Sequence, residues 1–271
     1  MITVLGASGY IGSALLDYLH KNNFIYFAPK RNDNSIFTRP LGDVIYTIGM
    51  TADFRTRPVD TARAHVSVLA DIIEKADFDS LTYLSSTRVY SGGNMASPDS
   101  PAQVHSQNPS DLYNITKLAG ESLCLHSGRN KTRVVRLSNV VGVSTVQSAN
   151  FIDEIVQEAL SGVLVMRTAP SSSKDYILLD DVVKMLPIIA TNGTQAVYNL
   201  AAGRNIRNYE WTEGLRNELK CEVIYKPDAP VWIFPEIDIK STVSELNFIP
   251  GSPLSVLPHL VARLKNIHES N

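Results

Sequence analysis

The chain has 271 residues and a nearly balanced charge, with 25 Lys and Arg against 27 Asp and Glu. Hydrophobic residues make up 44% and charged residues 19% of the chain, so a large core can form and general disorder is not expected. The balance argues against a nucleic-acid or anionic-membrane binder, because those proteins usually carry a basic face. No apolar run reaches the ~18–20 residues of a membrane span, and the first residues lack the pattern of a signal peptide. Two cysteines, Cys124 and Cys221, make neither a disulfide framework nor a metal cluster, as is typical of a reducing compartment. Together these features lead us to expect a soluble protein of the cytoplasm.

Short apolar segments alternate with patterns of helical period along the first half of the chain. We predict strands at 2–5, 24–27, 44–48, 81–84 and 133–137, with helices at 13–19, 61–75 and 111–125 between them. Such alternation requires crossover connections and a parallel sheet covered on both faces, so residues 1–145 are predicted to form a doubly wound (Rossmann) dinucleotide-binding domain. Residues 146–271, with predicted helices at 151–160 and 255–265 and strands at 163–166 and 197–200, are expected mainly to form a smaller mixed α/β substrate-binding lobe, some segments returning to the first domain.

Gly6, Gly9 and Gly12 form a G-x-x-G-x-x-G turn directly after the first strand. Glycine permits positive φ and close approach of the backbone to a pyrophosphate, and the helix start offers unpaired N–H groups to that anion. The alternative is a plain strand-to-helix turn that happens to be rich in glycine. We predict a nucleotide site whose cofactor-binding residues here are Gly6, Ser8, Gly9, Tyr10, Ile11 and Gly12.

The end of the second strand carries Lys30 and Arg31 where NAD-binding proteins usually carry an Asp or Glu. A carboxylate there would repel a ribose 2′-phosphate, whereas a guanidinium can pair with it through two hydrogen bonds. Lys30 and Arg31 therefore favour NADP(H) as the cofactor. NAD stays open, because Asp33 would be the acidic residue if the strand ran longer, and the two cations would then form an exposed basic turn.

Tyr113 and Lys117 form a Y-x-x-x-K pattern inside a predicted helix. Residues four apart share one helical face, and a nearby cation stabilises phenolate, which makes tyrosine a usable general acid/base. Tyr26 and Lys30 match the same pattern on a predicted strand, where the two ends lie roughly 13 Å apart, so only the helical pair can act together.

Ser85, Ser86 and Thr87 follow a predicted strand and point to the crevice where open α/β sheets bind ligands. One of these hydroxyls is expected to hydrogen-bond a substrate oxygen beside Tyr113, with helix capping as the alternative. The six histidines show no metal-ligand spacing, so no metal site is predicted.

Together these segments resemble the extended short-chain dehydrogenase/reductase family, in its NAD(P)-dependent nucleotide-sugar epimerase, dehydratase and reductase branch. The resemblance follows the chain in order through the glycine turn and residues 84–90, 110–117, 135–142, 174–181, 197–200 and 245–250. It implies that Tyr113 is the catalytic acid/base, that Lys117 holds the nicotinamide ribose, and that Ser86 is the catalytic Ser/Thr. It further implies substrate contacts from Ser86, Thr87, Asn139 and Lys174, and a homodimer packed through the helix that bears the tyrosine.

Four departures from the family pattern affect the expected function. Residues 32–42 leave no room for the further strand and helix that relatives usually have, so the adenine pocket is expected to be shortened. Thr87 and Arg88 stand where dehydratases carry an Asp-Glu pair, which disfavours dehydration. His65 stands where the family usually has Asn, and Lys174 occupies an arginine position, where it binds phosphate with one point charge instead of a bidentate fork.

The sequence therefore predicts an NADP(H)-dependent reductase of a keto group on a nucleotide-linked sugar, with a hydride from the nicotinamide and a proton from Tyr113. An epimerase with tightly bound NAD is the first alternative, and a catalytically idle dinucleotide sensor is the second. The expected partners are the small-molecule nucleotide sugar and a second copy of the chain, with neither nucleic acid nor membrane.

Overall fold

Six parallel strands form the central sheet of the computed structural model, which describes residues 1–50, 53–146 and 150–269. The strand order is β2-β1-β3-β4-β5-β9, and every neighbouring pair is parallel. The strands are β1 (Ile2–Leu5), β2 (Tyr26–Phe27), β3 (Asp43–Tyr46), β4 (Ser80–Ser86), β5 (Thr132–Leu137) and β9 (Val197–Leu200). This sheet confirms the doubly wound α/β fold, and β9 shows that a late segment returns to it.

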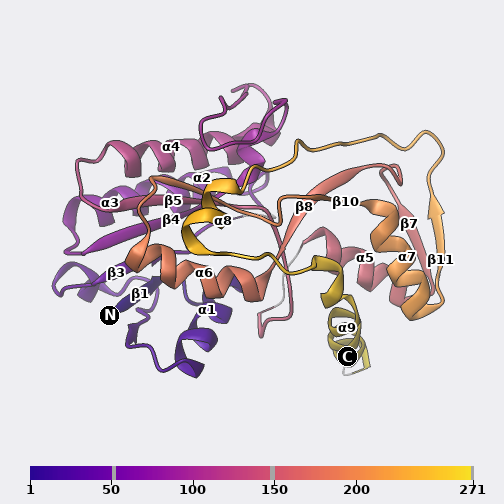
Figure 1. Cartoon of the computed structure of the whole chain (residues 1–271), viewed down its shortest axis with the longest axis horizontal. Coiled ribbons are helices and arrows are strands. Elements are labelled where there is room, and N and C mark those ends of the chain that lie inside the picture. The colour runs from indigo at the N-terminus through magenta and orange to yellow at the C-terminus, as the bar shows by residue number, and fades with distance from the viewer. Residues whose placement is uncertain (51–52, 147–149, 270–271) are drawn as a thin grey trace.

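Helices cover both faces of this sheet (Figure 1). One face packs on α1 (Tyr10–Lys21) and α6 (Leu179–Asn192), and the other on α3 (Val68–Lys75) and α4 (Leu112–His126). Leu15 and Leu19 of α1 are fully buried in the first layer, and Leu69 of α3 is fully buried in the second. Burying each such side chain stabilises the fold by about 1.5–3 kcal/mol, so the apolar faces of the helices fix them on the sheet.

A smaller mixed lobe contains two further sheets. The three-stranded sheet has the order β10 (Asn205–Arg207), β8 (Ser173–Leu178), β6 (Asn139–Val141), with β8 antiparallel to β10 and parallel to β6. Strands β7 (Val163–Met166) and β11 (Glu222–Tyr225) form the other sheet. Helices α5 (Phe151–Leu160), α7 (Asn208–Leu219) and α9 (Leu257–Glu269) pack around a core that includes the fully buried Trp211, while α8 (Lys240–Leu246) contacts β9.

Three predicted elements differ in detail from the structure. The helix predicted over 61–75 consists of α2 (Pro58–Ala62), a π-helical segment at Arg63–Ser67 and α3, so the register of its buried face changes at His65. Strand β2 is half the predicted length, since it pairs only with β1 at the sheet edge and Ile25 is left exposed. The final helix begins as a 3-10 turn at Pro253–Val256, because proline fits the first turn of a helix, and α9 then continues to Glu269.

The connection from β2 to β3 is short, as expected from residues 32–42. Its regular structure is a single 3-10 turn at Asn34–Phe37, so β2 lies outside β1 with no further parallel strand beyond it. The strand order reverses between β1 and β3, and ligands of open α/β sheets bind outside the carboxyl ends of strands at such a reversal. The glycine turn after β1 and the segment after β3 therefore define where a nucleotide would lie.

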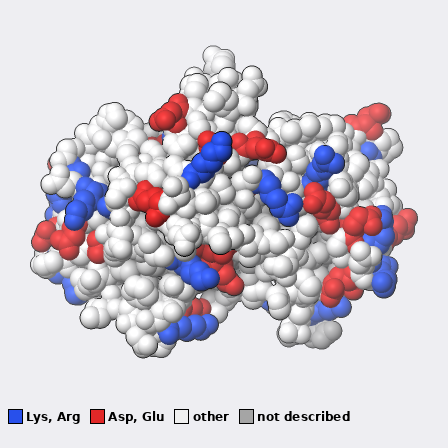
Figure 2. Space-filling model, in the orientation of Figure 1, with Lys and Arg blue, Asp and Glu red and all other residues white. Residues whose placement is uncertain are grey.

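The charged side chains of the visible face are mixed in sign (Figure 2), which agrees with the balanced composition. Across residues 1–50, 53–146 and 150–269, no helix has the length and apolar character needed to cross a bilayer.

Candidate active site

The glycine turn leaves the start of α1 open. Gly6 has φ +95°, and a Cβ there would lie 2.7 Å from Thr47 Oγ1 of the segment after β3. A Cβ on Gly12 would lie 2.3 Å from the Gly6 carbonyl oxygen, so both positions require glycine for the turn to close on itself and on β3. Ser8 and Gly9 are exposed, and Gly9 caps α1 without any side-chain hydrogen bond to the first-turn N–H groups. The turn thus presents free backbone donors to an anion.

The side chains of Tyr10 and Ile11 are engaged within the protein. The Tyr10 hydroxyl donates to the Gly142 carbonyl at 2.9 Å and so ties α1 to the loop after β6. Ile11 packs against the core between the sheet and α1. Their side chains therefore fix the helix, while their N–H groups lie in its first turn.

The end of β2 is basic and has no free carboxylate. Lys30 and Arg31 are exposed, and the guanidinium carbon of Arg39 lies 4.2 Å from the centre of the Phe27 ring, which adds a third cation that sequence reasoning missed. Asp33, the acidic residue considered for NAD, accepts the Ser35 N–H at 2.9 Å and caps the 3-10 turn. This hydrogen bond and the Arg39 charge hold the pKa of Asp33 below its usual value.

Tyr113 lies on α4 at the carboxyl end of β4, together with Ser86. The phenol is buried, with its ring centre 5.3 Å from that of His65 and 5.6 Å from that of Phe54. Burial raises the pKa of Tyr113, while the Ser86 hydroxyl and then the Arg88 guanidinium lower it. Ser86 ends β4 and its Oγ accepts the Arg88 N–H at 3.2 Å. The structure therefore brings together the two predicted catalytic oxygens.

Lys117 lies one turn further along α4 and is buried. Its Nζ donates to the Leu84 carbonyl at 2.8 Å and lies 5.9 Å from the centre of the Tyr113 ring. Burial lowers the pKa of Lys117 to about 7, against a smaller opposing effect of Glu121. A Cβ built on Gly49 would lie 3.5 Å from this ammonium, so a glycine after β3 keeps the approach to Nζ open at the strand reversal.

His65 links three parts of the site. Its Nε2 accepts the Met50 N–H at 3.2 Å, and its Nδ1 lies 2.8 Å from Thr116 Oγ1. Thr116 donates to the carbonyl of Leu112 or Tyr113, so the Nδ1 nitrogen is the donor toward Thr116 and the imidazole is neutral. Burial, followed by the Lys117 charge, lowers the pKa of His65 to about 2. This imidazole positions the segment after β3 against the helix that bears Tyr113.

The predicted substrate residues lie on the neighbouring strands. Asn139 is exposed at the start of β6 and its amide donates to the Asp175 carbonyl at 2.8 Å, which places it beside Lys174 of β8. Lys174 Nζ lies 6.0 Å from the centre of the Phe151 ring. Thr87 is buried at the start of the 3-10 turn Thr87–Tyr90, directly after Ser86.

Comparisons with known proteins identify the family of the chain. Residues 42–201 match the NAD dependent epimerase/dehydratase family. The chain belongs to this family. Among curated proteins none matches the sequence significantly.

Solved structures with the same fold extend over the whole length of the chain. MoeE5 in complex with UDP-glucose and NAD is 19% identical, with a TM-score of 0.81 over 97% of this chain and 98% of that one. UDP-glucose 4-epimerase from Thermotoga maritima is 19% identical, with a TM-score of 0.79 over 98% and 99%. RMD from Pseudomonas aeruginosa, complexed with NADPH, is 19% identical, with a TM-score of 0.76 over 96% and 98%. At this identity the likeness establishes the fold.

A buried polar network lies between α4 and the strands β4 and β5, next to the site of this member of the epimerase/dehydratase family. Sequence reasoning missed this network. Arg136 of β5 pairs with Glu121 of α4, with Nη2 2.6 Å from Oε2. Glu121 also accepts the Ser85 hydroxyl at 2.5 Å, and Arg136 Nη1 donates to the Tyr90 hydroxyl at 2.7 Å. The available signal was the spacing of Glu121, four residues after Lys117 on the same face of the helix.

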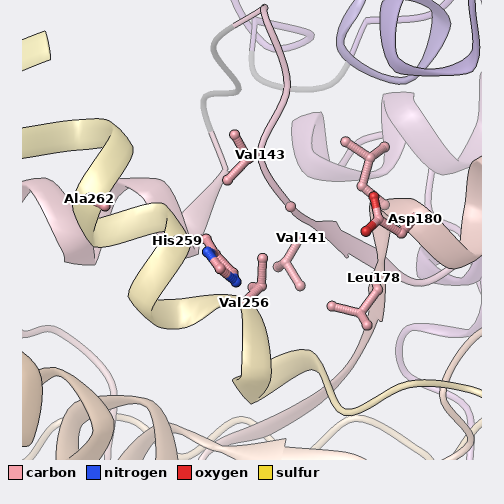
Figure 3. Close-up of a pocket in the computed structure, with 9 residues that line it drawn as sticks. Val141, Val143, Leu178, Asp180, Val256, His259 and Ala262 are labelled. Atoms are coloured by element: carbon pink, nitrogen blue, oxygen red, sulfur yellow. The ribbon is translucent and has the colours of Figure 1, made fainter. Parts of the chain in front are cut away.

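A cavity of about 360 Å³ lies elsewhere, between α9 and the junction of β8 with α6 (Figure 3). Val141, Leu178 and Val256 give it apolar walls, and Asp180 and His259 add polar side chains to its lining. None of the predicted catalytic residues lines it. No group of three or more His, Cys, Asp or Glu side chains in the described part of the chain is arranged to hold a metal ion.

Replacing Lys117 with Met is expected to raise the free energy of unfolding near neutral pH, because burial penalises the ammonium that the variant removes. The pKa of Lys117 is about 7 in the folded chain, against about 10.4 in the unfolded chain. The unfolded chain binds more protons between these values, so wild-type stability rises with pH across that window and the advantage of the variant shrinks. Urea denaturation near both limits measures this, with Lys265→Met as an exposed control. An advantage that stays constant with pH would contradict it.

Proposed function

We propose that the chain is an NADP(H)-dependent reductase of a keto group on a nucleotide-linked sugar. The basic end of β2 carries this proposal. Lys30, Arg31 and Arg39 gather there, while the Asp33 carboxylate is engaged in capping its own turn. A 2′-phosphate fits three cations, and NADP(H) serves mainly as an exchanging reductant.

The residues present fit a dinucleotide. The open start of α1 offers its N–H groups to a pyrophosphate, and Gly6 and Gly12 keep the turn tight enough for close approach. Gly49 leaves Lys117 Nζ accessible from the carboxyl end of β3. Lys117 Nζ is therefore placed to bind the hydroxyls of the nicotinamide ribose. When bound, the nicotinamide supplies the hydride, and the chain supplies orientation and the proton.

Tyr113 is the proton donor in this proposal. Its burial keeps the phenol protonated at neutral pH, which is the state that reduction of a carbonyl requires. Ser86 lies beside it and is placed to donate a hydrogen bond to the same substrate oxygen. The Arg88 charge near the ring stabilises the phenolate left after transfer.

An epimerase with tightly bound NAD is the second candidate. It is favoured by the structural likeness to MoeE5, bound to UDP-glucose and NAD, and to the Thermotoga maritima UDP-glucose 4-epimerase. In that reaction Tyr113 accepts and returns the same proton, so the two candidates share their residues and differ in net use of the cofactor. The gathering of Ser86, Tyr113 and Lys117 at one strand end speaks against an idle sensor.

A homodimer through α3 and α4 accompanies this proposal. Their outer faces border a groove of about 790 Å³ with the small or apolar side chains of Val66, Ala70, Ile73, Ala119 and Leu123 along it. In a dimer with a two-fold axis, the same apolar groove of each copy would face the other copy, so one interface would cover both grooves.

Titration of cofactor fluorescence tests the cofactor part of the proposal. The chain is expected to bind NADPH about 10–100-fold more tightly than NADH, since charge-assisted hydrogen bonds contribute about 1.5–3 kcal/mol. Arg31→Ala is expected to weaken NADPH binding and leave NADH binding unchanged, whereas Arg57→Ala, which removes an exposed arginine paired with Asp60, leaves both unchanged. Equal affinity for the two cofactors would overturn the preference.

Net consumption of NADPH separates the two reactions. A reductase consumes one NADPH for each keto-sugar converted, and an epimerase converts sugars with no net change in dinucleotide absorbance. Copurification of NAD with such conversion would replace the first candidate by the second.

A further inference from the structure

Arg88 lies against Tyr113. In the sequence it was noted only because Thr87 and Arg88 replace the Asp-Glu pair of dehydratases, and no role was predicted for its side chain. Its guanidinium carbon is 5.5 Å from the centre of the Tyr113 ring and 5.0 Å from that of Phe54. It follows Ser86 by two residues, and its backbone N–H is bonded to the Ser86 hydroxyl oxygen. A substrate atom that reaches the phenol therefore has the guanidinium as its neighbour.

Arg88 forms no ion pair within the part of the chain that the structure describes. Among the residues that the structure describes, no carboxylate lies within 4.0 Å of Arg88, Arg55 or Lys174, the three cations that influence one another here. Asp111 is the acidic residue that acts on Arg88 from farther away, and its own Oδ2 accepts the His105 N–H at 3.0 Å. Arg88 is half-buried, whereas Arg55 and Lys174 are exposed. A half-buried cation without a carboxylate partner is costly, which favours an anionic ligand at Arg88.

Most of the hydrogen-bonding capacity of this guanidinium is available to a ligand. Its Nη2 donates to the Ser110 carbonyl at 3.2 Å, which holds the side chain over Phe54. Arg55 binds the Ser110 hydroxyl from the exposed side, through Nε at 3.3 Å and Nη2 at 3.2 Å. An arginine carries five N–H donors in a planar fork that matches a carboxylate, and a positioned fork loses little freedom on binding.

We propose that the reacting sugar carries a carboxylate, as in a nucleotide-linked uronic acid, and that Arg88 holds this group while the keto carbon faces Tyr113. This inference rests on the proposed function and names its substrate class. Lys174 of β8 is left for the diphosphate, so the two anionic parts of the substrate have separate cations. Because Arg88 lies next to the Tyr113 phenol, we assign Arg88 to the sugar and not to the diphosphate. The diphosphate is attached to the other end of the sugar ring, away from the reacting carbon.

Calorimetric titration with matched nucleotide sugars tests this assignment. Glucuronate and glucose, each linked to UDP, dTDP or GDP, are titrated into the chain loaded with NADPH, which cannot reduce these alcohol forms. The acidic member of the pair that fits is expected to bind about 10–100-fold more tightly than the neutral one. Arg88→Gln removes this difference and leaves the neutral member within about twofold, and Arg88→Lys retains part of it.

Arg216→Gln, which alters an exposed arginine of α7 paired with Glu213, serves as the matched control and leaves all affinities unchanged. NADPH affinity and thermal unfolding of each variant show that the fold is retained. Equal or tighter binding of the neutral sugars would overturn the inference, as would a uniform loss of both members in Arg88→Gln, or no binding of any pair to the NADPH-loaded chain. Binding of the acidic sugar without any NADPH-consuming reaction of its keto form would overturn the reductase proposal alone.

Discussion

Replacing Tyr113 with Phe is expected to lower the rate of keto-sugar reduction by about 10²–10⁴-fold, because it removes the proton donor. The ring contacts with His65 at 5.3 Å and Phe54 at 5.6 Å are made by carbon atoms that Phe retains. The variant therefore loses one O–H group and little packing, and cofactor binding at the glycine turn is expected to stay as in the wild type.

Single-turnover loss of NADPH absorbance measures this effect, with cofactor affinity measured on the same preparations. Tyr209→Phe is the matched control, since Tyr209 is 43% exposed on α7 and its hydroxyl serves no predicted catalytic role. Turnover of Tyr113→Phe within a factor of two of wild type would remove Tyr113 from the mechanism. Equal loss in Tyr209→Phe would point to damage of the fold.

The chemistry of this tyrosine differs from the sequence-based expectation in one respect. The Y-x-x-x-K spacing predicted that Lys117 lowers the pKa of the phenol. In the structure burial raises the pKa of the phenol above its usual value, against smaller opposing effects of the Ser86 hydroxyl and the Arg88 guanidinium, and burial lowers the pKa of Lys117 itself to about 7. Lys117 donates to the Leu84 carbonyl instead, and its remaining N–H groups suit ribose hydroxyls.

Local patterns predicted the parts of this molecule that depend on neighbours in sequence. The glycine turn needs glycine at Gly6, which has φ +95°, and at Gly12, where a Cβ would clash. The G-x-x-G-x-x-G spacing in the sequence already indicates both requirements. The parallel sheet follows from apolar strands that alternate with helices. Ser86 and Tyr113 meet because the carboxyl end of β4 and the start of α4 converge at the same edge of the sheet.

Contacts between distant segments were not predictable in the same way. Arg88 lies over Phe54 and Tyr113 only because a 3-10 turn follows β4 and the segment after β3 folds back on α4. Arg39 reaches Phe27 because the β2–β3 connection, with its 3-10 turn at Asn34–Phe37, folds back on the end of β2. The pairing of Glu121 with Arg136 depends on the packing of α4 over β5, which no periodicity in either segment encodes.

Replacing Glu121 with Gln is expected to lower the free energy of unfolding by about 3–5 kcal/mol, because the Arg136 guanidinium is then left in the interior without its counter-charge. Glu121 is 3% and Arg136 is 7% exposed, so water cannot compensate for the lost charge. Glutamine has nearly the same shape, and the loss therefore reports on charge and hydrogen bonding instead of a cavity.

Urea denaturation measures this loss, and Glu213→Gln is the matched control. Glu213 forms an exposed pair with Arg216 on α7, and such pairs contribute about 0–1 kcal/mol. A cost below about 1 kcal/mol for Glu121→Gln would show that the buried pair is not a major source of stability.

The double variant Glu121→Leu with Arg136→Met separates stability from the positioning of the site. Replacing a buried ion pair with apolar residues of similar volume is often neutral or stabilising, so the double variant is expected to unfold at a urea concentration close to that of wild type. Its turnover is expected to fall nevertheless, because Ser85, bonded to Glu121, and Tyr90, bonded to Arg136, flank Ser86 on both sides along the chain. A stable double variant with full turnover would show that the Glu121–Arg136 pair is not needed to position Ser86 at the end of β4.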